Sequence, residues 1–344
     1  MAPLYQAINV QFQEDVPGSH AVYRAVADPE WTVAAVPNGG YLLANIIDAC
    51  MQFQTSAKSH PDPIHVTAHF LHSTAAAAFY VHVRFQKRGK GFTNLVAELI
   101  QNGKTTIISH LIFGILAPPP GSPNKTLAPP SPYARRVPLY RHPSTAPLEL
   151  EKIRDVYKFR QYFQCTQEPE IRAKVALDSP TRTNGTTIGG GGMEGGTWFG
   201  LTDRNERITT PSLALFADAF LNIPVLIPKS EPQALRWGDF TYDTCSWFPT
   251  MVITLEFKFP IPPPSKDHAS RTVGMFWRGN FVNDPQGRHE TYVELWSAPS
   301  DVGEGFEVDG WRDNQVCLAV ANQMSLSLPM EVNLKQGNND SAKL

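Results

Sequence analysis

The stretch Ile100-Gln101-Asn102-Gly103-Lys104 lies between two runs in which apolar and polar residues alternate. Asn-Gly favours the left-handed backbone angles of a two-residue turn, so the stretch predicts a tight β-hairpin. It belongs to a unit that begins at a Gly-Gly helix start, Asn38-Gly39-Gly40-Tyr41, and ends at Phe113. A second unit of the same order runs from Thr210-Pro211-Ser212 to Leu328. A helix followed by several antiparallel strands, twice over, predicts an α+β chain of two like modules, with a ligand bound at their seam.

Each unit has one expected helix with a continuous apolar side. The first covers 37–54, and its apolar residues at helical spacing are Leu42, Leu43, Ile46, Ile47 and Cys50. The second begins at Thr210-Pro211, a capping residue followed by proline at the first helical position, and Pro224 is expected to stop it. Alternation predicts strands at 65–70, at 79–86, on both sides of Asn102-Gly103, at 250–259, on both sides of Asp284-Pro285-Gln286-Gly287, and at 316–325.

Composition divides the chain into four parts. The 344 residues suit two domains, and 42% hydrophobic residues are enough for a sizeable core. Between the two units, prolines cluster with serine and threonine, which predicts an extended linker on the surface. The polar stretch from Lys335 to Ser341 is expected to be flexible. The predicted parts are an N-terminal module at 1–116, a Pro-rich linker at 117–150, a C-terminal module with inserted loops at 151–330 and a flexible tail at 331–344.

Charge and hydropathy exclude several classes of protein. A net charge of -2 favours neither nucleic acid nor an anionic membrane surface as a partner. No apolar run is long enough to cross a bilayer, and residues 1–13 lack the basic-then-apolar order of a secretory signal. No metal-binding pair and no disulfide framework is expected of the four cysteines, which are Cys50, Cys165, Cys245 and Cys317. We expect no metal and no cofactor.

Three polar residues are candidates for chemistry, although each has an ordinary structural explanation. Asp218 lies on an otherwise apolar helix, where an unpaired buried carboxylate is costly and a solvent-facing one is the default. Gln323 lies on a strand face of small side chains, which leaves room for water or a ligand, although an amide bonded to the backbone is equally ordinary. Thr250 opens a strand, as a good β-former often does. Asp48, on the first helix, ranks below Asp218.

Other patterns support no further chemistry. The chain has no Gly-x-Ser-x-Gly nucleophile elbow. The run from Gly189 to Gly192 lacks the lysine of a phosphate-binding loop and is expected to be a flexible connection or a lid. No acidic residue joins the histidines of the first module at ligand spacing, so strand or pocket histidines are favoured over a metal site for His65, His69, His72 and His82.

Several motifs together resemble acyl-CoA thioesterase II. In the first half these are Asn38 to Leu43, His65 to Leu71 and Ile100 to Lys104. In the second half, three motifs are similar to those that carry the family's catalytic Asp, Thr and Gln: Ala217-Asp218-Ala219-Phe220, Thr250 at the family's distance before Phe257 and Pro260, and Leu318 to Gln323. The resemblance covers most of the chain outside the linker and the tail.

The resemblance implies a double hotdog, in which each of two modules has a long helix wrapped by a curved antiparallel sheet. It also implies hydrolysis of acyl-CoA thioesters to free acid and CoA by a water that Asp218, Thr250 and Gln323 hold. The carboxylate can accept the proton of that water, and N–H groups at a helix start suit the developing oxyanion. Substrate-binding roles are then expected for Asn38, Gly39, Gly40 and His65.

Two departures from the family pattern bear on the substrate. Bacterial members often have an Asp-His pair just after the Thr, where this chain has Val252-Ile253. The linker is longer, and 297–314 is an insertion rich in Asp, Glu and Gly. These features resemble a fungal-type branch of the thioesterase-like superfamily, some of whose members act in secondary metabolism. Two alternatives stay open: a hotdog enzyme that releases, cyclises or dehydrates a polyketide or another acyl thioester, and a non-catalytic acyl-binding module.

The last three residues, Ala342-Lys343-Leu344, resemble the peroxisomal address Ser-Lys-Leu with Ala in place of Ser. We therefore expect a peroxisomal import receptor as a partner and the peroxisome as the location, or otherwise the cytoplasm. Double hotdog chains often pair, so a homodimer is expected by analogy.

Overall fold

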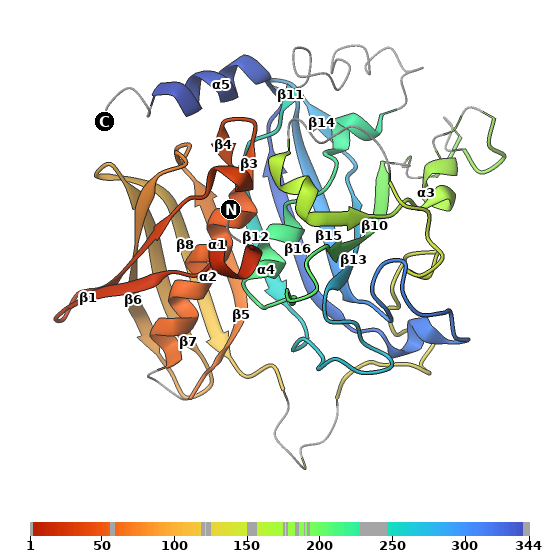
Figure 1. Cartoon of the computed structure of the whole chain (residues 1–344), viewed down its shortest axis with the longest axis horizontal. Helices are drawn as coiled ribbons and strands as arrows, with labels where there is room; N and C mark the ends of the chain where they lie inside the picture. Colours follow the sequence, from red (N-terminus) through yellow and green to blue (C-terminus); the bar gives the residue numbers. More distant parts are fainter. Residues whose placement is uncertain are drawn as a thin grey trace.

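The computed structural model has two modules side by side, the first in red to yellow and the second in green to blue (Figure 1). A 13-stranded sheet runs through both modules in the order β1-β2-β6-β7-β8-β5-β12-β16-β15-β13-β10-β9, with β14 paired to β15. The residues that the structure describes are 3–55, 59–117, 121, 125–149, 157–174, 176, 178–182, 186–188, 190, 193–227 and 246–339.

In the first module, the strands wrap around helix α2. The elements are α1 (Leu4–Ala7), β1 (Gln11–Val16), β2 (His20–Val26), the 3-10 helix η1 (Pro29–Trp31), β3 (Thr32–Val33), β4 (Val36–Pro37), α2 (Gly39–Thr55), β5 (Asp62–Phe70), β6 (Ala78–Arg88), β7 (Thr93–Gln101) and β8 (Lys104–Gly114). The predicted hairpin joins β7 to β8, and Asn102 and Gly103 have the left-handed φ angles 51° and 72°. Strands β1 and β2 were not predicted; β1 is almost wholly exposed and therefore has no apolar alternation to reveal it.

The second module has the same layout with a much shorter helix. The elements are η3 (Lys158–Tyr162), β9 (Phe163–Cys165), α3 (Pro169–Ala173), β10 (Glu194–Leu201), α4 (Ser212–Ala217), η4 (Ile223–Leu226), β11 (Ser246–Trp247), β12 (Thr250–Phe257), β13 (Thr272–Arg278), β14 (Val282–Asn283), β15 (Arg288–Ser297), η6 (Trp311–Asn314), β16 (Cys317–Ser325), β17 (Leu328–Pro329) and α5 (Met330–Asn339). The prediction of a long second helix is wrong: α4 has 6 residues, and Asp218 comes directly after its last turn. Thr210 does not cap it, because Pro211 occupies the N-cap position without a side-chain bond.

Strands β5 and β12 join the modules into one sheet by antiparallel pairing, with His69 opposite Val252. Helix α2 packs against α4 across the same seam. A Cβ on Gly40 would lie 2.3 Å from the carbonyl oxygen of Ala214, so only glycine allows the helices to approach this closely. A large apolar core fills the space between the sheet and the two helices. This is the predicted double hotdog arrangement, with one long helix and one short helix.

The linker packs on the second module, which corrects the prediction of an extended surface segment. Part of it contributes to a buried apolar cluster on the sheet face opposite α4, whose members include Val137, Leu139, Ala146, Trp198, Trp296 and Trp311. The insertion at 297–314 packs there too, and Nε of Arg312 donates to the carbonyl oxygen of Leu139 at 3.2 Å. Linker and insertion therefore form a common cover over this face.

The tail expected from residue 331 begins instead with helix α5, which packs against β4 of the first module and against β11 and β17 of the second. Asn333 is fully buried, and its Oδ1 accepts the N–H of Ala35 while its Nδ2 donates to the carbonyl oxygen of Val33, both at 3.0 Å. These bonds satisfy a buried amide and fix a polar helix that has little apolar surface. The tripeptide Ala342-Lys343-Leu344 lies outside the described residues, as do Cys245 and three glycines of the run 189–192.

Candidate active site

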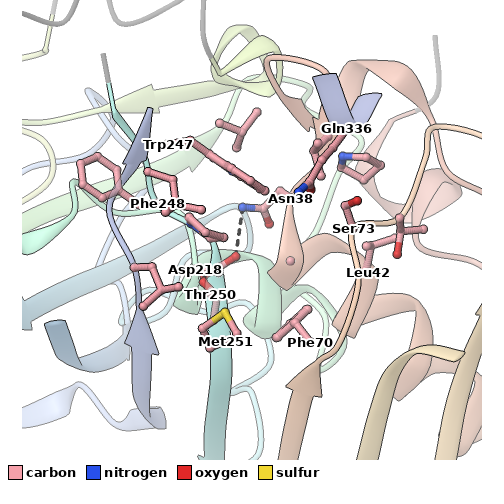
Figure 2. A pocket seen from close by; sticks show the side chains of 18 of the residues that line it. Asn38, Leu42, Phe70, Ser73, Asp218, Trp247, Phe248, Thr250, Met251 and Gln336 are labelled. Carbon is pink, nitrogen blue, oxygen red and sulfur yellow. Dashed lines mark hydrogen bonds between the residues drawn. The ribbon is translucent and has the colours of Figure 1, made fainter. Parts of the chain in front are cut away.

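Asp218 lies where the helices of the two modules meet. Its Oδ2 accepts hydrogen bonds from the backbone N–H of Gly40 at 2.8 Å and from Nδ2 of Asn38 at 3.1 Å. Figure 2 shows the Asn38 side chain directed at this carboxylate. N–H groups at the start of a helix carry positive partial charge, so the start of α2 stabilises the ionised Asp218. The site therefore combines groups from both modules.

Thr250 reaches the same carboxylate because β12 is bulged at its first residues. Strict alternation would place Thr250 on the face opposite that of Ile253. The pairing of β12 with β16 shifts at Met251, and this extra residue returns Thr250 to the side of the helices. As a result, Oγ1 of Thr250 lies 2.9 Å from Oδ1 of Asp218.

Gln323 holds Thr250 from the neighbouring strand β16. Its Oε1 lies 3.0 Å from Oγ1 of Thr250, and its Nε2 donates to the carbonyl oxygen of Ala217 at 3.1 Å. Gln323 is buried and is not among the described residues that line the cavity beside Asp218. The small side chains near it, such as Ala321, leave room for α4 to pack on β16 rather than for a ligand.

The surroundings of Asp218 make its carboxylate more basic than an ordinary one. Burial raises the pKa of Asp218 from 3.8 to about 6, and hydrogen bonds from Gly40, Thr250, Asn38 and Gln323 oppose the rise. At neutral pH the carboxylate is therefore mostly ionised and is still able to accept a proton.

The first turn of α2 leaves one N–H group for a ligand. Asn38 caps the helix, because its Oδ1 accepts the N–H of Tyr41 at 2.9 Å. The N–H of Gly40 is bonded to Asp218. Within the described part of the chain, nothing accepts a hydrogen bond from the N–H of Gly39, which lines the cavity. An N–H in this position suits an oxygen atom that acquires negative charge during a reaction.

A cavity of about 440 Å³ lies beside these groups and is lined by residues of both modules. Figure 2 shows Trp247 and Phe248 on one side of Asp218 and Phe70 on the other. Helix α5 contributes Gln336 to the wall. Aromatic walls with a few converging polar groups are typical of a site for an organic ligand that has both apolar and polar parts.

The structure brings the three predicted catalytic residues together. Of the four predicted binding residues, it places two at the cavity and two away from it. Asn38 and Gly39 line the cavity, whereas Gly40 faces α4 and contributes its N–H to Asp218. His65 does not belong to the site: it lies on the other face of β5 from Phe70, about 16 Å away along the strand. The alternation of β5 places residues 65 and 70 on opposite faces, so the sequence already contained the signal for this correction.

Sequence reasoning missed most of the cavity wall. Trp247, Phe248 and Met251 come just before or within the bulged start of β12, and Gln336 comes from the unpredicted helix α5. His72 lines the cavity, as one of the expected strand or pocket histidines. The described residues contain no cluster of His, Cys, Asp or Glu suited to a metal ion. None of the described helices has the length and apolar composition needed to cross a membrane.

The first module is similar in sequence to known proteins. Residues 27–114 match the family model of the acyl-CoA thioesterase N-terminal domain. Over 88 residues the chain is 31% identical to the ustilagic acid biosynthesis cluster protein orf2 of Mycosarcoma maydis. These matched residues make up 25% of this chain and 23% of that protein. The match thus spans about a quarter of the length of this curated relative.

Solved structures match nearly the whole chain in fold. A proposed thioesterase II from Thermobifida fusca YX has a TM-score of 0.64 at 20% identity, covering 95% of this chain and 98% of that one. A hot dog fold protein of unknown function from Alicyclobacillus acidocaldarius has a TM-score of 0.60 at 15% identity, with coverages of 95% and 98%. Acyl-CoA thioesterase II TesB2 from Mycobacterium marinum has a TM-score of 0.56 at 11% identity, with coverages of 94% and 98%.

The two kinds of match agree, one in sequence over the first module and the other in fold over both modules. The resemblance inferred from the sequence is confirmed: residues 27–114 match the model of the acyl-CoA thioesterase N-terminal domain, and the whole chain has the double hotdog fold seen in solved structures that include thioesterase II proteins.

Proposed function

We propose that this protein hydrolyses acyl-CoA thioesters to the free acid and CoA, with a water molecule activated by Asp218. One observation carries the proposal: hydrogen bonds link the carboxylate of Asp218, the hydroxyl of Thr250 and the amide of Gln323 beside a cavity lined by both modules. Within this framework, Asp218 is the general base, Thr250 orients the water, and Gln323 positions Thr250.

The hydrogen-bond pattern leaves a place for water at Oδ1 of Asp218. Oδ2 already accepts two hydrogen bonds, whereas Thr250 is the one described residue whose hydrogen bond ends on Oδ1, with the amide of Gln323 also near the carboxylate. Thr250 has a single hydroxyl hydrogen and two possible acceptors, Oδ1 of Asp218 and Oε1 of Gln323. When the hydroxyl donates to Gln323, a water can donate to Oδ1 and also to Oγ1 of Thr250. Its oxygen lone pair is then free to attack a thioester carbonyl.

The reaction needs no covalent enzyme intermediate. The water oxygen bonds to the carbonyl carbon while its proton passes to Asp218, and the carbonyl oxygen becomes an oxyanion to which the N–H of Gly39 can donate. Collapse of this intermediate breaks the carbon–sulfur bond, and Asp218 returns the proton to the leaving sulfur. General base catalysis of this kind contributes roughly 10²–10⁴-fold in rate.

The alternative functions left open by the sequence are supported to different degrees by the site and the comparisons. A non-catalytic acyl-binding module would not require Thr250 and Gln323 to converge on a basic carboxylate, so their convergence favours an enzyme. An acyl thioester of secondary metabolism is favoured by the similarity of 88 residues of this chain to a protein of the ustilagic acid biosynthesis cluster. Dehydration is less well supported, because neither hotdog helix, α2 nor α4, contains a histidine.

A release assay tests the proposal. Free CoA is measured with a thiol reagent for the full chain over a panel of straight, branched and hydroxylated acyl-CoAs, beside Asp218→Ala and the control Asp48→Asn. Asp48 is likewise a carboxylate with a burial-raised pKa, but it bonds to Val10 and Gln52 and does not line the cavity. We expect Asp218→Ala to lose roughly 10²–10⁴-fold in kcat and Asp48→Asn to retain turnover. Turnover of Asp218→Ala equal to that of the wild type would refute the assignment.

The proposal also includes a location in the cell, the peroxisome, and a state of assembly, the homodimer. The sequence Ala342-Lys343-Leu344 supports import into peroxisomes, where acyl-CoA esters are handled. A fluorescent protein fused to the N-terminus should give punctate peroxisomal fluorescence, and removal of these three residues should make it diffuse. A diffuse signal from the intact fusion would contradict peroxisomal import. A homodimer stays a prediction by analogy, which light scattering on the purified chain can test.

A further inference from the structure

A second, smaller cavity of about 80 Å³ borders the first one. Tyr157 lines both cavities, and the residues that directly follow Asp218 in the chain line the second. Most of its walls are aromatic or apolar, and they include Phe159, Phe199, Phe220, Leu221, Met275 and Trp277. The two cavities therefore meet at Tyr157, and the second has the apolar walls that an acyl chain would need.

Arg160 brings a positive charge to this cavity, and none of the described acidic residues is paired with it. Its guanidinium lies over the ring of Phe199, 5.6 Å from the centroid, and Nη1 donates to Sγ of Cys165 at 2.7 Å. Burial raises the pKa of Cys165 to about 12, so this sulfur is a neutral thiol. No carboxylate of the described residues forms an ion pair with Arg160. A guanidinium has five N–H donors, and a partly buried charge without a counter-ion is costly.

The acidic residues of the same cavity already have partners. Glu149 is paired with Arg172 at 2.7 Å, and Glu194 is paired with Lys174. The carboxylate of Glu168 accepts backbone N–H groups, and burial raises its pKa to about 7, so it carries only part of its charge near neutral pH. Arg160 is therefore the cation that lines this cavity without an ion-pair partner among the described residues.

We propose that Arg160 binds a carboxylate at the far end of the acyl group, so that the preferred substrates are thioesters of dicarboxylic acids. This inference rests on the proposed function. A guanidinium and a carboxylate can form two parallel charge-assisted hydrogen bonds, and the aromatic walls suit the methylene groups between the two ends of the acyl chain. A phosphate of CoA is the other anion that Arg160 could meet, and the experiment separates the two sources.

The experiment compares adipyl and hexanoyl thioesters, which have the same chain length, on CoA and on N-acetylcysteamine, which has no phosphate. We expect the wild-type kcat/KM to favour adipyl over hexanoyl by roughly 10–100-fold on both carriers, as for one charge-assisted contact. Arg160→Met should bring this ratio close to one, and Arg160→Lys should keep part of it. Lys158→Gln removes an exposed cation of the same 3-10 helix that does not line the cavity, so the ratio should stay at its wild-type value.

Each other outcome has a definite meaning. A ratio near one in the wild type, or a preference that survives Arg160→Met, overturns the carboxylate site, while hydrolysis of hexanoyl-CoA upholds the proposed function. A loss of kcat/KM in Arg160→Met that is confined to the CoA esters, whatever the acyl group, assigns Arg160 to a phosphate and overturns the proposal as well.

If the wild type hydrolyses none of the four esters, the proposed function fails. Calorimetric titration with the two N-acetylcysteamine esters then decides the site, with tighter binding of adipyl supporting it. If Arg160→Met does not fold, as judged by circular dichroism, Arg160→Lys carries the test.

Discussion

The backbone N–H of Gly40, in the first module, donates to the carboxylate of Asp218, in the second, at 2.8 Å. Gly40 is also the residue whose missing side chain lets α2 approach the carbonyl of Ala214 in α4. The helix crossing and the direction of the carboxylate therefore depend on the same residue. Neither module alone contains the complete candidate site.

The rate of hydrolysis should depend on a single ionisation near pH 6. Only the ionised carboxylate of Asp218 can accept a proton, and its pKa is raised to about 6. We expect kcat/KM to be constant well above this pH and to fall about tenfold for each pH unit below it. The measurement is a pH profile of thiol release, with Asp48→Asn as the control whose profile should match that of the wild type. A profile that stays flat down to pH 4.5 would rule out Asp218 as the base.

The same pKa predicts that Asp218→Asn makes the protein more stable at neutral pH. The folded pKa of about 6 lies above the value of 3.8 for the free side chain, so the free energy of unfolding falls as pH rises from about 4 to about 6 and stays low above that. The penalty is at most roughly 3 kcal/mol, since part of the side chain faces the cavity. An Asn can keep its oxygen toward Gly40 and turn its amide nitrogen toward Thr250. Thermal unfolding at pH 4 and pH 7 should show a stabilisation by the variant only at pH 7, and an equal or lower Tm at pH 7 would contradict the prediction.

Thr250 should matter through its hydroxyl and not through its methyl group. Thr250→Val keeps the shape and the bulged strand but removes the group within hydrogen-bond distance of Asp218 and Gln323, so we expect a loss of roughly 10²-fold in kcat. Thr250→Ser keeps the hydroxyl and should retain most of the activity. Steady-state kinetics of the two variants provide the check. Equal activities would show that the hydroxyl has no part in the reaction.

Gly39 and Gly40 should respond differently to alanine. Alanine favours a helix over glycine by roughly 1 kcal/mol. At Gly40 this gain is outweighed, because the new Cβ would lie 2.3 Å from a backbone oxygen of α4 and 2.6 Å from Cβ of Asp218. Gly40→Ala should therefore lower Tm and abolish activity. At Gly39 the new Cβ would meet the ring of Phe70 at 3.1 Å and Oδ2 of Asp218 at 3.2 Å, so the fold should survive with a higher KM. Equal Tm values for the two variants would contradict this reasoning.

Helix α5 should be needed for both stability and substrate binding. Asn333→Ala removes both bonds of a fully buried amide to the β3–β4 hairpin and leaves an N–H and a carbonyl unsatisfied, at a cost of roughly 1–3 kcal/mol. Because α5 carries Gln336 in the cavity wall, we also expect a higher KM. Chemical denaturation and acyl-CoA kinetics test the two effects, with Glu331→Gln on the exposed side of α5 as the control. Wild-type stability of Asn333→Ala would show that the helix is held by other contacts.

Elements with a local signal could be predicted from the sequence. The Asn102-Gly103 turn, the apolar side of α2 and the alternation of β12 and β16 each depend on residues close together in the chain. The three candidate catalytic residues were found because they stand in motifs of a known family. Their convergence beside one cavity required the structure.

Features fixed by distant contacts could not be predicted. The bulge at Met251 reverses the face on which Thr250 lies, and alternation alone gives the wrong face. Helix α5 has a polar composition, and it is held by hydrogen bonds from Asn333 to a hairpin some 300 residues earlier in the chain and by packing of Met330 against Ala34 of the same hairpin. The linker looked like a free segment because the tryptophans that it covers, Trp198 and Trp296, lie on strands far along the sequence.

The pairing of β5 with β12 has a practical consequence for anyone who wishes to cut this protein in two. Separate expression of the halves would uncover a long row of unpaired backbone groups along each of these strands, which are interior to the continuous sheet. Such edges recruit other chains, so isolated halves should precipitate or associate through these strands. Reconstitution should accordingly start from both halves produced in the same cell.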